Sequence, residues 1–78
     1  LNVHPNPSEG LVNIELKEIA EYNILLIDVL GSIAYSQTKS LNEIVTLDLS
    51  GLNQGIYLMR LTNKNSRQVY LHKIILVF

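Results

Sequence analysis

The amino-acid sequence predicts an all-β domain, built as a sandwich or a barrel, and three observations lead to this fold class. Apolar and polar residues alternate with a period of two in several segments, which is typical of half-buried β-strands. Turn-forming residues recur about every 8–12 residues, a spacing that suits six or seven short strands. Apolar residues make up 47% of the chain and charged residues 17%, a balance typical of folded domains. With 78 residues, the chain is expected to form one domain with a small core.

The chain begins with a turn-rich segment and continues as a strand. Residues 4–10 contain two prolines, which fix φ and lack an N–H donor, so neither a helix nor a central strand is expected there. In residues 11–16, Val12, Ile14 and Leu16 alternate with polar residues. This pattern predicts a strand that buries one face.

Residues 16–30 fit two interpretations, because their apolar residues suit both helical spacing and a strand. We favour a loop at 17–21 and a strand at 22–28, with a helix as the alternative. The run Ile24-Leu25-Leu26-Ile27 is apolar on both faces, which is typical of a central strand covered on both sides.

A hairpin turn is predicted at Asp28-Val29-Leu30-Gly31. Asp28 suits the first position of a type I turn, where its carboxylate accepts backbone N–H bonds, and Gly31 can take a positive φ and form a bulge. A return strand at 32–36 and a polar loop at 37–42 are expected to follow.

The C-terminal half predicts three further strands, at 43–49, 56–62 and 67–78, separated by a turn at 50–55 and a hairpin loop at 63–66.

Four side chains are assigned a place within these elements. Leu52 is expected to be a buried anchor in its turn, and Asn65 is able to adopt a left-handed conformation in the hairpin loop. Ile24 and Leu58 are assigned to the core.

Composition and charge exclude several classes of function. A net charge of -1, from 6 basic and 7 acidic residues, builds no basic stripe, so nucleic acid is not an expected partner. The absence of cysteine excludes disulfides, thiolate metal sites and a cysteine nucleophile. His4 and His72 fall short of the three or four ligands that a zinc site needs, and no catalytic serine or nucleotide-binding glycine motif occurs. We therefore expect no cofactor, no metal, no catalysis and no small-molecule substrate.

The ends of the chain bear on its origin. It begins at Leu1 rather than Met, so we expect a fragment or a processed product of a longer protein, with any export signal upstream. The longest apolar run, residues 74–78, is much shorter than the roughly 20 residues that cross a bilayer.

Five motifs follow one another in a specific order along the chain. They are Val3-His4-Pro5-Asn6-Pro7, Asp28-Val29-Leu30-Gly31, Leu47-Asp48-Leu49-Ser50-Gly51-Leu52, Gly55-Ile56-Tyr57-Leu58 and Lys73-Ile74-Ile75. Taken from Val3 to Phe78, this order resembles the C-terminal sorting domain, type A, of proteins exported by the type IX secretion system, also called the Por secretion system. Carried over by position, the resemblance implies these sorting-motif residues: Pro5, Asn6, Pro7, Asp28, Gly31, Gly55, Tyr57 and Lys73.

The resemblance implies an immunoglobulin-like β-sandwich of about seven antiparallel strands, with residues 1–78 as a single C-terminal sorting domain of a larger exported protein. The domain would be non-catalytic and would direct its cargo, often a hydrolase or an adhesin, across the outer membrane of a Gram-negative cell. The cargo would pass through the periplasm and end at the cell surface or outside the cell. The implied partners are the outer-membrane secretion machinery and a surface protease that removes the domain.

We expect recognition to use the final strand, residues 69–78, as an edge strand to which a receptor adds its own strand. Lys73 would supply an oriented charge, and Ile74, Leu76 and Phe78 would act as apolar anchors. An exposed edge would also let two copies of the chain pair as a weak homodimer.

The alternative is a carbohydrate-binding or adhesive β-sandwich module of a surface protein. Sugar binding commonly uses exposed aromatic rings, and this chain has no Trp, four Tyr and one Phe. Tyr35 and Tyr70 are the candidate platforms for this function.

Overall fold

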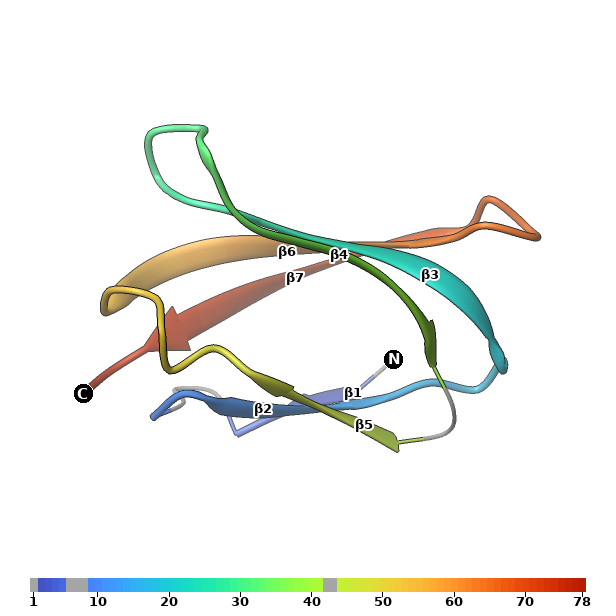
Figure 1. The fold of residues 1–78 in the computed structure, drawn as a ribbon, viewed down its shortest axis with the longest axis horizontal. Helices are drawn as coiled ribbons and strands as arrows, with labels where there is room; N and C mark the ends of the chain where they lie inside the picture. Colours follow the sequence, from blue (N-terminus) through green and yellow to red (C-terminus); the bar gives the residue numbers. More distant parts are fainter. Residues whose placement is uncertain (1, 6–8, 42–43) are drawn as a thin grey trace.

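The computed structural model describes residues 2–5, 9–41 and 44–78 (Figure 1). Within these residues it contains seven strands: β1 (Asn2–His4), β2 (Leu11–Glu15), β3 (Ala20–Ile27), β4 (Ile33–Leu41), β5 (Ile44–Asp48), β6 (Gly55–Asn63) and β7 (Val69–Leu76). The described residues include no helix that is long and apolar enough to cross a membrane.

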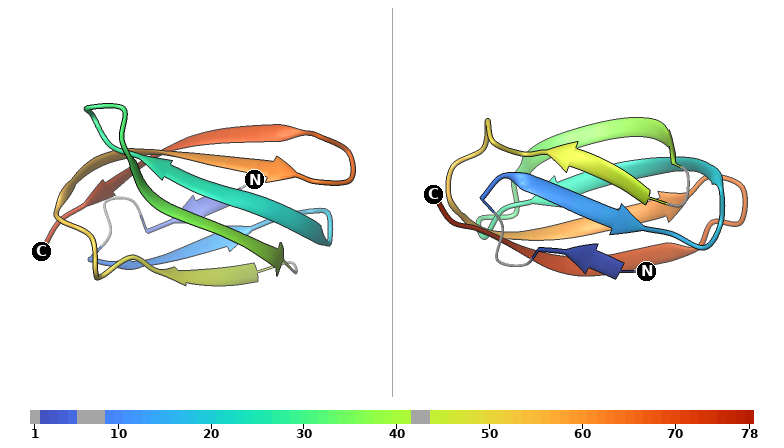
Figure 2. Two further views of the ribbon diagram at one scale, coloured as in Figure 1. Left: turned by 45° about the horizontal axis from the view of Figure 1, so that its top comes forward. Right: turned by 90° about the horizontal axis from the view of Figure 1, so that it is seen from below.

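The strands form two antiparallel sheets that pack face to face (Figure 2). The smaller sheet has the order β1-β2-β5 and the larger sheet the order β4-β3-β6-β7. The chain therefore crosses between the sheets after β2, after β4 and again after β5. This arrangement is an immunoglobulin-like β-sandwich in which β4 joins the larger sheet, and it confirms the predicted fold class. The helical alternative for residues 16–30 is wrong.

The core lies between the two sheets and is built from alternate residues of the strands. The smaller sheet and the segments that follow its strands contribute Val3, Val12, Ile14, Leu16, Leu47 and Leu49. The larger sheet contributes Tyr22, Ile24, Leu26, Tyr57, Met59, Leu61, Ile74 and Leu76. Each aliphatic side chain buried in this way contributes about 1.5–3 kcal/mol, which is the main force that holds the two layers together.

The strand β3 lies at the centre of the larger sheet, between β4 and β6, but only one of its faces is covered. Ile24 and Leu26 are buried against the smaller sheet, whereas Leu25 and Ile27 are half-buried on the opposite side. The prediction of a strand covered on both sides is wrong, because the fold has two layers and nothing among the described residues is stacked on the outer face.

Two strands differ from the prediction, because β4 is longer than expected and β1 is additional. The polar segment expected as a loop belongs to β4, where Thr38 pairs with Asn23 and donates a 2.7 Å hydrogen bond from Oγ1 to Asn23 Oδ1. An edge strand can be polar because one side of it is solvated. The polar composition of this part of β4 therefore also suited a loop. β1 was not predicted, and its register with β2 places Val3 opposite Ile14 in the core.

The β6–β7 hairpin loop corrects the prediction for Asn65. The residue of the loop with a left-handed backbone is Arg67, with φ 64°. The Asn63 carboxamide Oδ1 accepts the N–H groups of Asn65 and Ser66 at 2.8 and 3.1 Å. These bonds stabilise the first part of the loop. The Arg67 N–H then closes it by donating to the Asn63 carbonyl at 2.8 Å.

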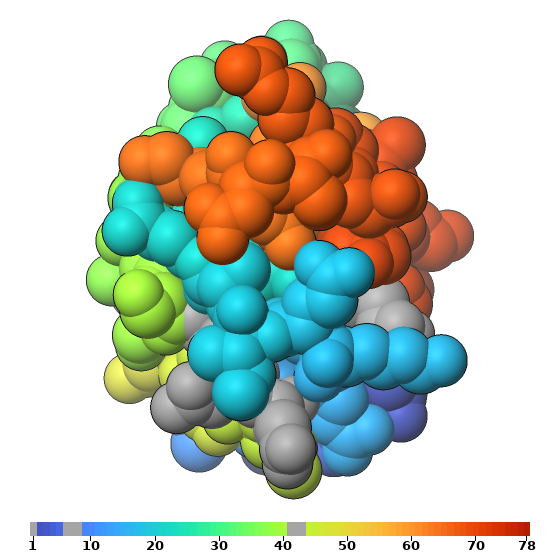
Figure 3. Space-filling view, turned by 90° about the vertical axis from the view of Figure 1, so that its right-hand side faces the viewer, coloured from blue at the N-terminus to red at the C-terminus, as the bar shows by residue number. Residues whose placement is uncertain are grey.

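The same loop is tied to the connection between β2 and β3, and the two segments lie side by side at one end of the molecule (Figure 3). The buried Asn63 donates from Nδ2 to Glu18 Oε2 at 2.8 Å. The Lys64 ammonium lies 2.8 Å from Glu21 Oε1 in an exposed ion pair. All hydrogen-bonding atoms of the Asn63 amide are thus engaged, so its burial costs little.

Candidate recognition surface

The strand β7 lies at the edge of the larger sheet. It pairs only with β6 among the described residues, in a register that places Leu58 opposite Lys73 and Tyr57 opposite Ile74. This confirms the predicted edge position of the final strand. In Figures 1 and 2 the strand runs along one side of the sandwich to the C-terminus.

The two faces of β7 differ, and one part of the predicted anchor set is wrong. Ile74 and Leu76 are 0% and 1% exposed, because they fill the space between the sheets. They therefore cannot be anchors for a receptor while the domain is folded. Phe78, which lies beyond β7, is 61% exposed, and Leu71 on the outer side of the strand is 60% exposed.

The turn between β3 and β4 has the predicted construction. The Gly31 N–H donates to the Asp28 carbonyl at 3.0 Å, and Gly31 has φ 84°. The Asp28 carboxylate Oδ1 accepts the N–H groups of Leu30 and Ser32, each at 2.9 Å. Four hydrogen bonds thus hold a hairpin tip together, since Asp28 N–H also donates to the Ser32 carbonyl at 2.9 Å.

Gly55 and Tyr57 form the entry to β6. Gly55 has φ 154°, a conformation that side chains disfavour, and it opens the strand after the turn at 50–54. Tyr57 is buried, and its hydroxyl donates a 2.6 Å hydrogen bond back to the Asn53 carbonyl. Gly55 therefore allows the backbone to enter β6, and Tyr57 stabilises the connection between β5 and β6.

The opening motif is described only in part. Pro5 is exposed and follows β1, whereas Asn6 and Pro7 lie outside the described residues. A close backbone contact follows shortly afterwards: Gly10 has φ 124°, and a Cβ built on it would lie 3.1 Å from the Ser50 Cβ. Leu49 N–H donates to the Gly10 carbonyl at 2.7 Å. This role of Gly10 was not predicted, although its place directly after a proline-rich turn is a signal of it.

Three of the predicted residues meet in space. Asp28, Tyr57 and Lys73, which come from three different elements, line one hollow of about 190 Å³ at the larger sheet, although the Tyr57 side chain is only 7% exposed and faces the smaller sheet. Aliphatic residues that the sequence reasoning did not assign to a site complete its lining: Ile27, Val29, Ile56 and Leu58. Pro5 lies elsewhere, beside Glu9, Leu11 and Asn13 on the smaller sheet.

Leu58, which was assigned to the core, belongs to this hollow. It is 42% exposed, because Tyr57, Met59 and Leu61 are the apolar residues of β6 that face the smaller sheet. Its assignment to the core is wrong. Because both faces of β6 carry apolar residues, the sequence pattern did not indicate which face the smaller sheet would cover.

Hydrogen bonding and burial each shift pKa values in this domain. Hydrogen bonds from the Ser50 hydroxyl, at 2.6 Å, and from its backbone N–H, at 3.0 Å, lower the pKa of the Asp48 carboxyl. Burial raises the pKa of Tyr22 and of Tyr35. Within the described residues, no three His, Cys, Asp or Glu side chains gather in a way that could hold a metal ion.

Comparison with known proteins gives one match that covers nearly all of the chain. The family model described as secretion system C-terminal sorting domain matches residues 2–77. No curated protein matches the chain.

Proposed function

We propose a mode of action for this chain, which belongs to the family of secretion system C-terminal sorting domains. Members of this family are sorting signals of the type IX secretion system, so the chain is a sorting domain that acts through the machinery of that system. The family role implies export of the attached protein to the cell surface or the extracellular space. It also favours sorting over a carbohydrate-binding function, for which the candidate platforms Tyr35 and Tyr70 are half-buried against the core.

The domain is proposed to be the C-terminal unit of a larger protein. Residues 1–78 would form one non-catalytic module, and the cargo would cross the periplasm before the outer-membrane machinery receives it. A surface protease would then separate the domain from its cargo. The matched family of sorting domains supports this order of events.

Recognition is proposed to use the edge of β7. The supporting observation is the position of β7 at the end of the larger sheet, where a strand of the receptor could extend the sheet. Lys73 and Ile75 already make further interactions within the chain. We therefore place the first contact at Val69 and Leu71, with Lys73 orienting the incoming strand by its charge. The same edge would allow a weak homodimer, which sedimentation at increasing protein concentration would detect.

The test is a fusion of residues 1–78 behind a periplasmic reporter, in a host that has type IX secretion. The reporter is expected at the cell surface or in the medium. Removal of residues 71–78 is expected to hold it in the periplasm, but this deletion also removes core residues. A second variant, Lys73→Ala, keeps the core, and Lys17→Ala is its matched control because Lys17 is exposed on the connection between β2 and β3. Periplasmic retention of the parent fusion, with its fold confirmed by circular dichroism, would refute the proposed function.

A further inference from the structure

The outer face of the larger sheet, which is the side turned away from the smaller sheet, has an unusual pattern at its centre. Across β6 and β7, Leu58 lies opposite Lys73, and Arg60 lies opposite Leu71. Leucine and cation therefore alternate along each strand, and each leucine lies opposite a cation of the other strand. All four side chains are exposed, with Leu58 at 42% and Leu71 at 60%.

The apolar part of this face continues toward the β3–β4 hairpin. Ile27, Ile56 and Leu58 line the hollow described above, and Lys73 borders it. The hairpin tip beside it carries Val29 and Leu30, which are 78% and 87% exposed. Its four hydrogen bonds order the backbone of the tip, whereas these two side chains remain exposed. Apolar surface that is both exposed and ordered is typical of an interaction site.

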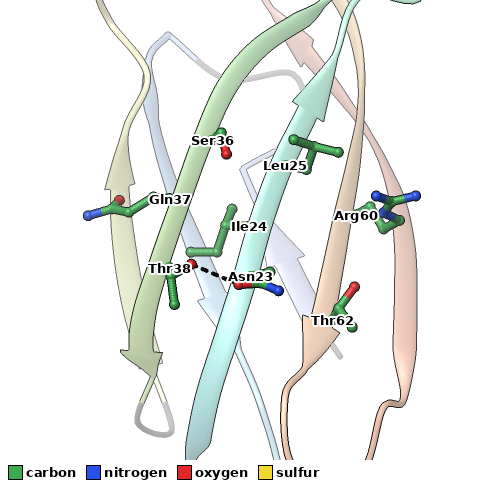
Figure 4. A pocket seen from close by; sticks show the side chains of 8 residues that line it. All are labelled: Asn23, Ile24, Leu25, Ser36, Gln37, Thr38, Arg60 and Thr62. Atoms are coloured by element: carbon green, nitrogen blue, oxygen red, sulfur yellow. Dashed lines mark hydrogen bonds between the residues drawn. The ribbon is translucent and has the colours of Figure 1, made fainter.

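The other side of Arg60 is polar. A second hollow of about 240 Å³ lies beside it, and Asn23, Thr38 and Thr62 form a polar row across its floor (Figure 4). Figure 4 shows the Thr38 hydroxyl directed at Asn23, whereas the Arg60 guanidinium extends away toward β7. Arg60 thus stands between an apolar hollow and a polar one.

The charge on this face is positive. Arg60 and Lys73 are its central charges, and Lys73 makes a further interaction within the chain. Asp28 accepts two N–H groups within its turn, and Glu21, at the far end of β3, is paired with Lys64 at 2.8 Å. The long stem of Arg60 can lie along the leucines while its charge remains accessible.

We propose that the outer face of the larger sheet binds an extended segment of the secretion machinery that alternates aliphatic and acidic side chains. An aliphatic side chain would enter the hollow beside Lys73, and a carboxylate would bind the Arg60 guanidinium through a bidentate pair. This inference rests on the proposed function and adds a second contact surface to the edge of β7.

Charge and pattern favour this occupant over two others. A second copy docked on the same face would bring Arg60 and Lys73 against their own equivalents, and this repulsion disfavours a dimer there. Binding to an anionic lipid surface usually separates an apolar face from a cationic one, whereas here the leucines and cations are interleaved. The interleaved pattern matches an extended polypeptide, whose side chains alternate at the same period.

The first test separates this surface from the edge of β7, because it changes β6 only. In the reporter fusion, the double variant Leu58→Asp and Arg60→Glu is expected to lose export. The matched control is Ile19→Asp with Lys17→Glu on the connection between β2 and β3, where Ile19 is 68% exposed. It likewise replaces one aliphatic residue by Asp and one cation by Glu at the same spacing, and it is expected to export normally. Thermal melts must show both variants folded. Normal export by the β6 variant would overturn the inference, while export of the parent would still support the proposed function.

The second test measures binding directly on the 78-residue chain. The probe is a synthetic hexapeptide of alternating Glu and Leu, titrated while the amide NMR signals are followed. It is expected to shift the signals of Leu58, Arg60 and Leu71, and to lose this effect with Arg60→Glu. A peptide of alternating Lys and Leu should leave those signals unchanged. Equal shifts with both peptides, or binding to phosphatidylglycerol vesicles but not to the acidic peptide, would refute the inference.

Discussion

The phenol hydroxyl of Tyr57 donates a 2.6 Å hydrogen bond to the backbone carbonyl of Asn53, four residues earlier in the chain. The same relationship occurs at the opposite end of the sandwich, where the Tyr22 hydroxyl donates to the Glu18 carbonyl at 3.1 Å. In both cases a buried ring on the larger sheet holds the connection by which the chain arrives from the smaller sheet. The two tyrosines therefore fasten the layers together at both ends.

Replacing Tyr57 by Phe keeps the ring in the core and removes only the hydrogen bond. We expect the free energy of unfolding to fall by about 1 kcal/mol, the usual net contribution of such a bond. Denaturant titration followed by circular dichroism measures this change. Tyr35→Phe is the control, because the Tyr35 hydroxyl bonds to the exposed Gln37, and it should stay within about 0.5 kcal/mol of the parent. Equal losses in both variants would contradict the proposed role of Tyr57.

Ile24 and Leu58 offer a direct comparison of the two faces of the larger sheet. Ile24 is 1% exposed and Leu58 is 42% exposed. Ile24→Ala should cost about 2–5 kcal/mol, which is comparable with the whole stability of a domain of this size, about 3–5 kcal/mol. Leu58→Ala should cost less than about 1 kcal/mol. Thermal melts would show a largely unfolded Ile24 variant beside a nearly native Leu58 variant, and the reverse order would contradict the placement of the core.

Gly31 tests the construction of the β3–β4 turn. Its φ of 84° is unfavourable for any residue with a side chain, although a Cβ there would meet no atom within 4 Å. Gly31→Ala should therefore cost about 1–2 kcal/mol through backbone strain alone. Gly51 has the same open surroundings without a positive φ, so Gly51→Ala should leave the denaturation midpoint nearly unchanged. A neutral Gly31 variant would show that the turn can relax.

Alkaline pH should weaken the domain through Tyr22. Burial raises the pKa of its phenol above the ordinary value of 10.0, and Tyr70 adds to this effect. Because the folded state holds the proton more tightly, the resulting stability is fully present below pH 10.0 and is lost as the pH rises through the raised pKa. Tyr22→Phe should unfold with a weaker pH dependence in that range, measured by denaturant titrations at several pH values. An unchanged pH dependence would assign alkaline unfolding to other groups.

Acid should act through Asp48, with the opposite sign. Hydrogen bonds from Ser50 lower the pKa of this carboxyl below 3.8, so the stability that they provide is present above that value. It is lost as the pH falls through the lowered pKa. Ser50→Ala should therefore be less stable than the parent at neutral pH, and the difference should shrink in strong acid. A difference that is constant with pH would rule out the Asp48 carboxylate as its source.

Local patterns were sufficient for much of the fold, because they depend on neighbours in the sequence. The alternation of Val12 and Ile14 identified a strand and its buried face. Asp28 and Gly31 specified their turn correctly, since a carboxylate beside free N–H groups and a residue able to take a positive φ need no distant partner. The order of short motifs also identified the family, which the match over residues 2–77 confirms.

Long-range contacts decided the rest. Leu58 and Leu61 lie on the same apolar strand, and only the position of the smaller sheet determines that Leu61 is buried while Leu58 is exposed. The meeting of Asp28, Tyr57 and Lys73 in one hollow depends on the pairing of β3, β6 and β7, which no local pattern contains. Period-two alternation distinguishes two faces of a strand but cannot say which of them another layer will cover, because burial is a property of the assembled sandwich. For that reason local patterns were enough to predict most of the strands, the Asp28–Gly31 turn and the family, whereas the packing of the two sheets determines which surface remains available to a partner.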